Sequence, residues 1–298
     1  MPIYDLTYEG FRGQRSRTPV WFPILENTIL LAFRNRTLFW TYLIGAVPTL
    51  IAIVYLYLRY QIQAMDSGSG FRGRMGAMFV FEIKSYFQFL SSQGVVAMII
   101  AGIVGSAAIG NDRRGNALEA IFARPVTLGS YLLGRWLGLF VLVLGATLIP
   151  ALTIWYFDNA LSLDPDRLSK TLSYPIRLAA WSIVHSTSVS LLVLAFSALI
   201  SRGWVALAGY AGFAFITSGL IGALAAAVNR AYEPAAVYLR GFGYVEALFQ
   251  IQHAILGVPE NLHSLKTSTL TSAIWLAFLA LVSIGVLVRK VRPIEVVS

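Results

Sequence analysis

The sequence predicts an all-α polytopic membrane protein with six transmembrane helices. Hydrophobic residues make up 57% of its 298 residues and charged residues 12%, about half the charged share of a soluble domain. Six runs contain no Asp, Glu, Lys or Arg: residues 38–58, 95–109, 136–157, 178–200, 203–228 and 270–288. Because backbone groups in lipid must be satisfied internally, runs of this length are expected to be α-helices. The second run reaches spanning length when it is extended back to about residue 86.

Residues 1–37 are predicted to be a cytoplasmic amino-terminal segment that contains an interfacial helix. Leu25, Ile29, Ala32 and Phe33 fall on one helical face, which is typical of a helix lying in the membrane surface. The alternative is that this stretch is the start of a long first span. An even number of spans puts both ends on one side, and Lys and Arg in the tails and the 110–135 connection favour the cytoplasm.

The remaining connections and the tail follow the same scheme. The Gly/Ser-rich segment 65–78 is expected to be an external loop. Residues 243–257 are mostly apolar but too short to cross, so they are predicted to form an external re-entrant or interfacial segment. The six-span domain then covers residues 38–288, and residues 289–298 form a cytoplasmic tail.

The sequence contains no recognisable catalytic, cofactor or metal motif. There is no Cys, no phosphate-binding Gly-x4-Gly-Lys loop, no HExxH and no GxSxG, and Asp and Glu fall only in predicted loops. The Arg residues are spread over separate loops, which argues against nucleic-acid binding. The net charge of +9 fits contact with anionic membrane lipid instead.

One face of the fourth span is the candidate path lining. Ser182, His185, Ser186 and Ser190 recur at helical spacing, and they could line a route for a solute. The simpler interpretation is that these hydroxyls and small residues allow close helix packing. Small residues at positions 97, 101 and 105, at 134 and 138, and at 208 and 212 predict tight contacts of the same kind.

The connection between the second and third spans contains a short charged helix. Asp112 is predicted to cap the amide of Gly115, and the helix to run to about Arg124 before Pro125 stops it. The apolar side chains Leu118, Ile121 and Phe122 share one side, and they could fit a groove in a partner or lie against their own membrane.

This connection, "GNDRRGNALEAIFARPVTLGSYLLGRWLG", resembles the segment between the second and third spans of ABC type-2 permeases. The matching positions are Asp112, Gly115, Leu118, Glu119, Pro125, Tyr131, Leu132, Leu133 and Gly134. Asp112 replaces the more usual Glu, and Arg135 stands where the family often has Lys. Elsewhere the resemblance is one of architecture, with an interfacial helix, six spans and an apolar excursion before the last span.

The resemblance implies a permease subunit of an ATP-driven ABC transporter, expected to be an exporter in the bacterial inner membrane. It implies two partners besides membrane lipid: an ATP-binding cassette subunit that binds ATP and Mg, and a second permease copy or a sister permease. Residues 112–124 would be the coupling helix. The implied docking residues are Asp112, Arg113, Arg114, Leu118, Glu119, Ile121 and Phe122.

Two other functions stay open at this stage. An ion-coupled secondary transporter usually needs an intramembrane carboxylate or broken helices, and neither is visible. A membrane-embedded enzyme acting on lipid could use His185 with Ser186 or Thr187, yet no orienting carboxylate lies in a predicted span.

Overall fold

The fold was described from a computed structural model, which covers residues 18–64, 82–230, 232–258 and 267–291. Within these residues six helices are long and apolar enough to cross a membrane, so the predicted fold class is confirmed. They are α2 (Arg36–Ala64), α4 (Ile83–Arg114), α6 (Leu128–Ala160), α8 (Tyr174–Leu199), α9 (Gly203–Asn229) and α12 (Thr269–Lys290). The expected loop 65–78 and most of the expected tail lie outside the described residues.

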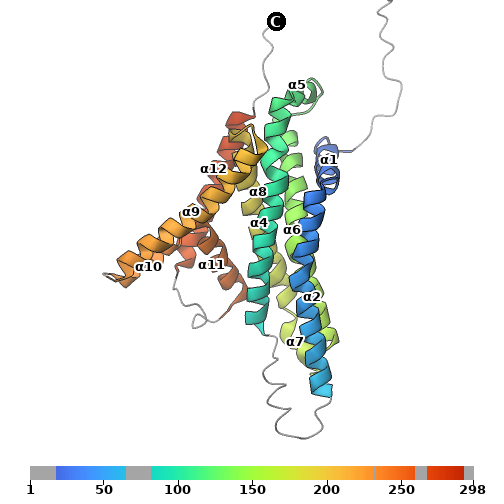
Figure 1. The fold of residues 1–298 in the computed structure, drawn as a ribbon, viewed down its shortest axis with the longest axis vertical. Coiled ribbons are helices and arrows are strands. Elements are labelled where there is room, and N and C mark those ends of the chain that lie inside the picture. Colours follow the sequence, from blue (N-terminus) through green and yellow to red (C-terminus); the bar gives the residue numbers. More distant parts are fainter. Residues whose placement is uncertain (1–17, 65–81, 231, 259–266, 292–298) are drawn as a thin grey trace, which may run out of the picture.

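Five shorter helices complete the described chain. They are α1 (Trp21–Phe33), α5 (Ala117–Phe122), α7 (Arg167–Thr171), α10 (Glu233–Arg240) and α11 (Tyr244–Leu256). Figure 1 shows α5 beyond the tip of α4 at one end of the bundle and α7 near the opposite end. We call these the α5 end and the α7 end.

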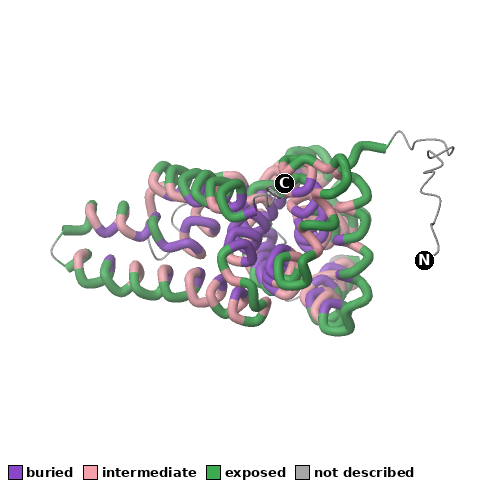
Figure 2. Tube along the Cα trace, turned by 90° about the horizontal axis from the view of Figure 1, so that it is seen from above, coloured by how far each residue is buried: buried purple, intermediate pink, exposed green. Residues whose placement is uncertain are grey.

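The core of the bundle is formed by α4, α6 and α8, which pack against one another. The share of buried residues in the most hydrophobic stretch of each span is 72% for α8, but only 17% for α9 and 11% for α2. Figure 2 shows the buried residues gathered at the centre, with α9 and α10 extending away as a largely exposed arm. The outer spans therefore present apolar surface to their surroundings.

Small residues allow close helix contacts at some of the predicted positions. A Cβ atom added at Gly138 would lie 2.7 Å from the Cβ of Thr28, and one at Gly134 would lie 2.7 Å from a backbone oxygen of α1. These distances leave no room for a side chain, so both glycines are needed for α1 to approach α6. The predicted pair at 208 and 212 differs, because a Cβ at Gly212 would meet only Ile216 of its own helix.

Helix α1 forms where an interfacial helix was predicted, and its buried side overlaps the predicted face in part: Leu25 and Ile29 are half-buried and Ala32 is buried, but Phe33 is not. Thr28 and Ala32 are buried against α6, while Phe33 is 59% exposed and stacks on Tyr42 with ring centroids 6.0 Å apart. The hydroxyl of Thr28 donates to the carbonyl of Ile24 at 2.8 Å, so this polar residue can be buried at little cost. Its small size suits the flat glycine surface of α6, which hydropathy alone does not reveal.

The apolar segment 243–257 contains α11, which lies inside the bundle without crossing it. A 13-residue helix is about 20 Å long, shorter than the hydrocarbon core. Near its start, the hydroxyls of Tyr244 and Ser188 lie 3.3 Å apart, and the amide of Val245 donates to the Ser218 hydroxyl at 3.0 Å. It ends at Gly257, whose φ of +69° suits a residue without a side chain.

Candidate functional site

The helix at the α5 end begins later than predicted, and Asp112 is not its cap. Helix α4 continues through Asp112 to Arg114, and the Gly115 amide donates to the carbonyl of Asn111 at 2.9 Å. The chain breaks only at Asn116, which has a left-handed φ of +51° that Asn tolerates better than most residues. No Pro lies between Ile83 and Gly115, and α4 continues beyond the uncharged run 95–109.

Asp112 instead belongs to a polar cluster that joins three helices. Its carboxylate accepts a hydrogen bond from the Tyr131 hydroxyl at 2.5 Å and forms an ion pair with Arg135. Arg135 also donates to the Thr28 hydroxyl at 3.2 Å. We call Asp112, Tyr131, Arg135 and Thr28 the Asp112 cluster. Because its members come from α4, α6 and α1, these helices are tied together at the α5 end.

Arg113 is also engaged within the chain. Its guanidinium donates to the carbonyl of Ala198 at 2.6 Å, which satisfies one of the last carbonyls of α8. Close by, the Ser197 hydroxyl accepts from the amides of Ile109 and Gly110 at 3.0 and 3.1 Å. These bonds tie the end of α8 to the end of α4.

The apolar side of α5 faces its own bundle. Leu118, Ile121 and Phe122 are half-buried and pack against the core, and the Phe122 ring lies 5.8 Å from that of Tyr131 in an edge contact. Glu119 and Arg124 are exposed. The seven residues implied as a docking surface therefore divide into an inward group and an outward group, and their contact with a partner stays a prediction.

The candidate path residues Ser182, His185, Ser186 and Ser190 lie on α8 at the helical spacing noted in the sequence, and all four are buried in the bundle. The cavity beside His185 measures about 10 Å³, which holds one water molecule at most. None of these four side chains has a hydrogen-bond partner among the described residues. Their role as a path lining stays a prediction, and in this conformation they are closely packed.

The catalytic alternative gains no support from the surroundings of His185. Its ring stacks on Trp181 with centroids 4.8 Å apart and packs against Gly94. Within the described ranges, no carboxylate pairs with its nitrogens and no group of His, Asp or Glu could hold a metal ion. Acid–base work by His185 would need an orienting partner that these residues do not supply.

A second buried ionic cluster lies at the α7 end, where the sequence suggested none. Asp158 is 1% exposed and pairs with Arg59 at 3.1 Å and Arg167 at 2.6 Å, and it accepts from the Tyr86 hydroxyl at 3.0 Å. We call these four residues the Asp158 cluster. The expectation that Asp and Glu fall only in loops was wrong, because α6 extends to Ala160. The available signal was that Arg59 and Asp158 each directly follow a predicted span.

No model of a known protein family matches the chain, and a search of curated proteins finds no match either. The class of protein therefore comes from the fold: the chain is an integral membrane protein with six membrane-spanning α-helices.

Proposed function

We propose that the chain is the permease subunit of an ATP-driven transporter of the ABC type-2 kind, powered by a separate ATP-binding cassette subunit. The observation that carries the proposal is α5, a short helix placed outside the spans between the second and third of them. It contains the Leu118–Glu119 pair of the motif. Since the sequence has no phosphate-binding loop of its own, ATP and Mg would be bound by the partner.

The packing of α5 suits the transmission of force into the bundle. Phe122 rests on Tyr131, and Tyr131 belongs to the Asp112 cluster, which joins α4, α6 and α1. A displacement of α5 would therefore move the ends of these helices together. Glu119 and Arg124 face outward and would contact the ATPase subunit.

The proposal includes a second permease copy or a sister permease. Few residues of α9 are buried; Ala208 is exposed, and a Cβ at Gly212 would meet only Ile216 of the same helix. Small residues of this kind allow close helix contact between membrane proteins. We further propose a bacterial inner-membrane location with both ends cytoplasmic and transport directed outward.

Copurification with charge-reversed variants tests this function. The tagged chain is extracted from its own membrane in mild detergent, and the partners are identified by mass spectrometry with an ATPase assay. Glu119→Lys should reduce recovery of an ATPase subunit about tenfold, because the new charge lies on the exposed side of α5 and leaves the core contacts intact. Glu82→Lys is the matched control, since Glu82 is exposed at the start of α4.

Two outcomes would contradict the proposal. One is that the unaltered chain is recovered without any ATPase subunit. The other is that Glu119→Lys and the inward-facing variant Phe122→Ala both retain the subunit and full transport activity. Loss of the subunit in Glu82→Lys as well would show that charge reversal acts on the whole complex rather than at α5.

A further inference from the structure

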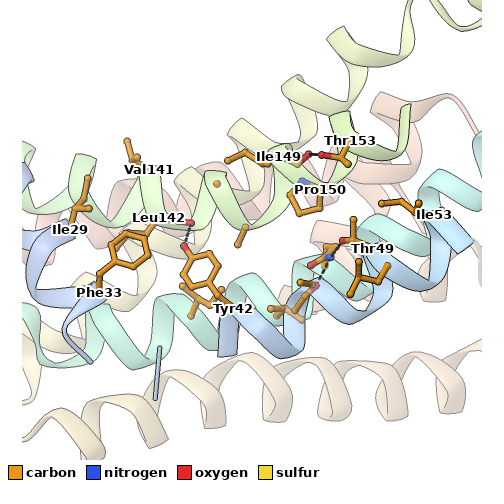
Figure 3. Close-up of a pocket in the computed structure, with 18 residues that line it drawn as sticks. Ile29, Phe33, Tyr42, Thr49, Ile53, Val141, Leu142, Ile149, Pro150 and Thr153 are labelled. Carbon is orange, nitrogen blue, oxygen red and sulfur yellow. Dashed lines mark hydrogen bonds between the residues drawn. The ribbon is translucent and has the colours of Figure 1, made fainter. Parts of the chain in front are cut away.

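A groove of about 600 Å³ opens on the side of the bundle between α2 and α6, with α4 as its floor. Figure 3 shows side chains of α1, α2 and α6 around it, among them Phe33, Tyr42, Ile149 and Ile53. Its volume lies within the range of small-molecule binding sites in proteins. The part of α6 that lines it, from Val141 to Thr153, belongs to an uncharged span, so the groove faces the hydrocarbon of the bilayer.

The groove is held open by contacts at both of its ends. Near the α5 end, the Tyr42 hydroxyl donates to the carbonyl of Leu142 at 2.6 Å. Near the α7 end, Arg59 of α2 pairs with Asp158 of α6. These two contacts fix the separation of α2 and α6, so the space between them is a built feature of the fold.

The polar side chains that line the groove are already engaged within the chain. The Gln93 amide donates to the carbonyl of Gly45 at 2.8 Å and to the Thr49 hydroxyl at 3.1 Å. The Thr153 hydroxyl donates to the carbonyl of Ile149 at 2.8 Å. Apolar cavities of this kind do not retain water but take up hydrocarbon ligands, so the groove suits an apolar occupant.

Small residues keep the middle of the groove free. A Cβ atom at Gly145 would approach nothing nearer than the Cδ1 atom of Ile149, at 3.9 Å. Ala146 lies beside Gly145, and Ala46 contributes from α2. Larger side chains at these positions would fill the space, which makes Gly145 the natural position at which to block it.

We propose that this groove binds one alkyl chain of a lipid from the surrounding bilayer. From Leu142 to Thr153 the groove follows twelve residues of α6, and their eleven rises of 1.5 Å give a length of about 16 Å. An extended chain advances about 1.2 Å per bond, so the groove takes about 13 carbon atoms.

The site deepens the proposed function, and its part in transport rests on that function. An alkyl-binding groove beside the core helices makes an amphiphile with a long alkyl tail the class of molecule that the permease would carry. The binding itself does not require an ATPase partner. A measurement of binding therefore separates the two proposals.

Photolabelling in nanodiscs tests the groove. The full chain, in the form recovered from its membrane, is reconstituted with phosphatidylcholine that carries a diazirine in the middle of one acyl chain. Labelled peptides are mapped by mass spectrometry after illumination. Peptides from residues 141–153 should be labelled several times more strongly than the outer face of α12, which exposes Leu270, Ile274 and Leu281 and serves as the internal reference.

Variants that fill the groove test whether the labelling of residues 141–153 comes from lipid bound there. Gly145→Leu should reduce labelling of residues 141–153 at least fivefold, because its side chain fills the space. Gly285→Leu is the matched control, since a Cβ at Gly285 meets nothing within 4 Å on the exposed side of α12; it should label like the unaltered chain. If Gly145→Leu fails to fold, Ile53→Trp blocks the groove from the opposite wall.

The proposal would be overturned if residues 141–153 were labelled no more than the α12 reference, or if blocking variants left their labelling unchanged. A second copy in the groove is tested with Ile149→Cys, the sole thiol in a chain without Cys. Disulfide-linked dimers of this variant would also overturn the lipid site. If the groove is not labelled but an ATPase subunit copurifies, the lipid site is contradicted while the permease proposal is supported.

Discussion

Replacement of Asp158 by Asn tests whether the Asp158 cluster holds the α7 end together. The aspartate is 1% exposed, and two guanidinium groups and one hydroxyl converge on its carboxylate. Asn keeps the shape of the side chain but removes its charge. The variant therefore leaves Arg59 and Arg167 close together without a counter-charge.

The expected loss follows from the burial of the three charged groups. Removing one partner of a buried ion pair costs about 3–5 kcal/mol. The side chains of Arg59 and Arg167 are 10% and 14% exposed at the end of the bundle, so they can turn partly toward water and lipid head groups. We therefore expect about 3 kcal/mol, the lower end of that range. At about 2–4 °C per kcal/mol for a large domain, the melting temperature should fall by about 6 °C or more.

Thermal unfolding of the purified chain in detergent, followed by circular dichroism, measures this shift. The matched control is Asp164→Asn, which breaks the pair of Asp164 with Lys170 at 2.7 Å. Both of those side chains are largely exposed, so the control should melt like the unaltered chain. Equal melting temperatures for Asp158→Asn and the control would refute the assignment of a stabilising role to the cluster.

Two further substitutions probe the packing of the core. Gly138→Val should lower the melting temperature by several degrees, because a Cβ would lie 2.7 Å from that of Thr28 and overpacking costs about 1–3 kcal/mol. The control Gly285→Val should leave the melting temperature unchanged. Equal melting temperatures for the two variants would refute close packing of α1 on α6. His185→Phe should leave the melting temperature unchanged or raise it, because the ring keeps its place on Trp181 while two unpaired buried nitrogens are removed. Lost activity with intact assembly in that variant would instead support a catalytic histidine.

The spans could be predicted from the sequence because lipid imposes one simple rule, a long run without charges. The rule fails at the ends of the spans, where side chains of opposite charge compensate one another. Asp158 looks like a loop residue because it follows the last apolar residue of its run, and its partner Arg59 is 99 positions away. Burial of such a group depends on a pairing that hydropathy does not encode.

The candidate site could be predicted in part. The motif places a short helix between the second and third spans, and α5 is there. Its direction could not be foreseen, because Leu118, Ile121 and Phe122 form an apolar side that would suit a partner as well as their own core. In the structure this side packs on the core, where the Phe122 ring contacts that of Tyr131, and its contact with a partner stays a prediction. The row from Ser182 to Ser190 lies on one face as expected, but whether that face lines an open space depends on the neighbouring helices.

The arrangement of the outer spans shows how one chain could both pair with a second copy and bind lipid. Helices α2 and α9 are the least buried spans, and they lie on opposite sides of the bundle (Figure 1). A second copy that packs on α9, against the small residues Ala208 and Gly212, would leave the groove between α2 and α6 open to the bilayer. A copy that packed on α2 would instead cover the groove. The same Ile149→Cys crosslink therefore distinguishes the two arrangements, and a permease that takes its cargo from the bilayer requires the first.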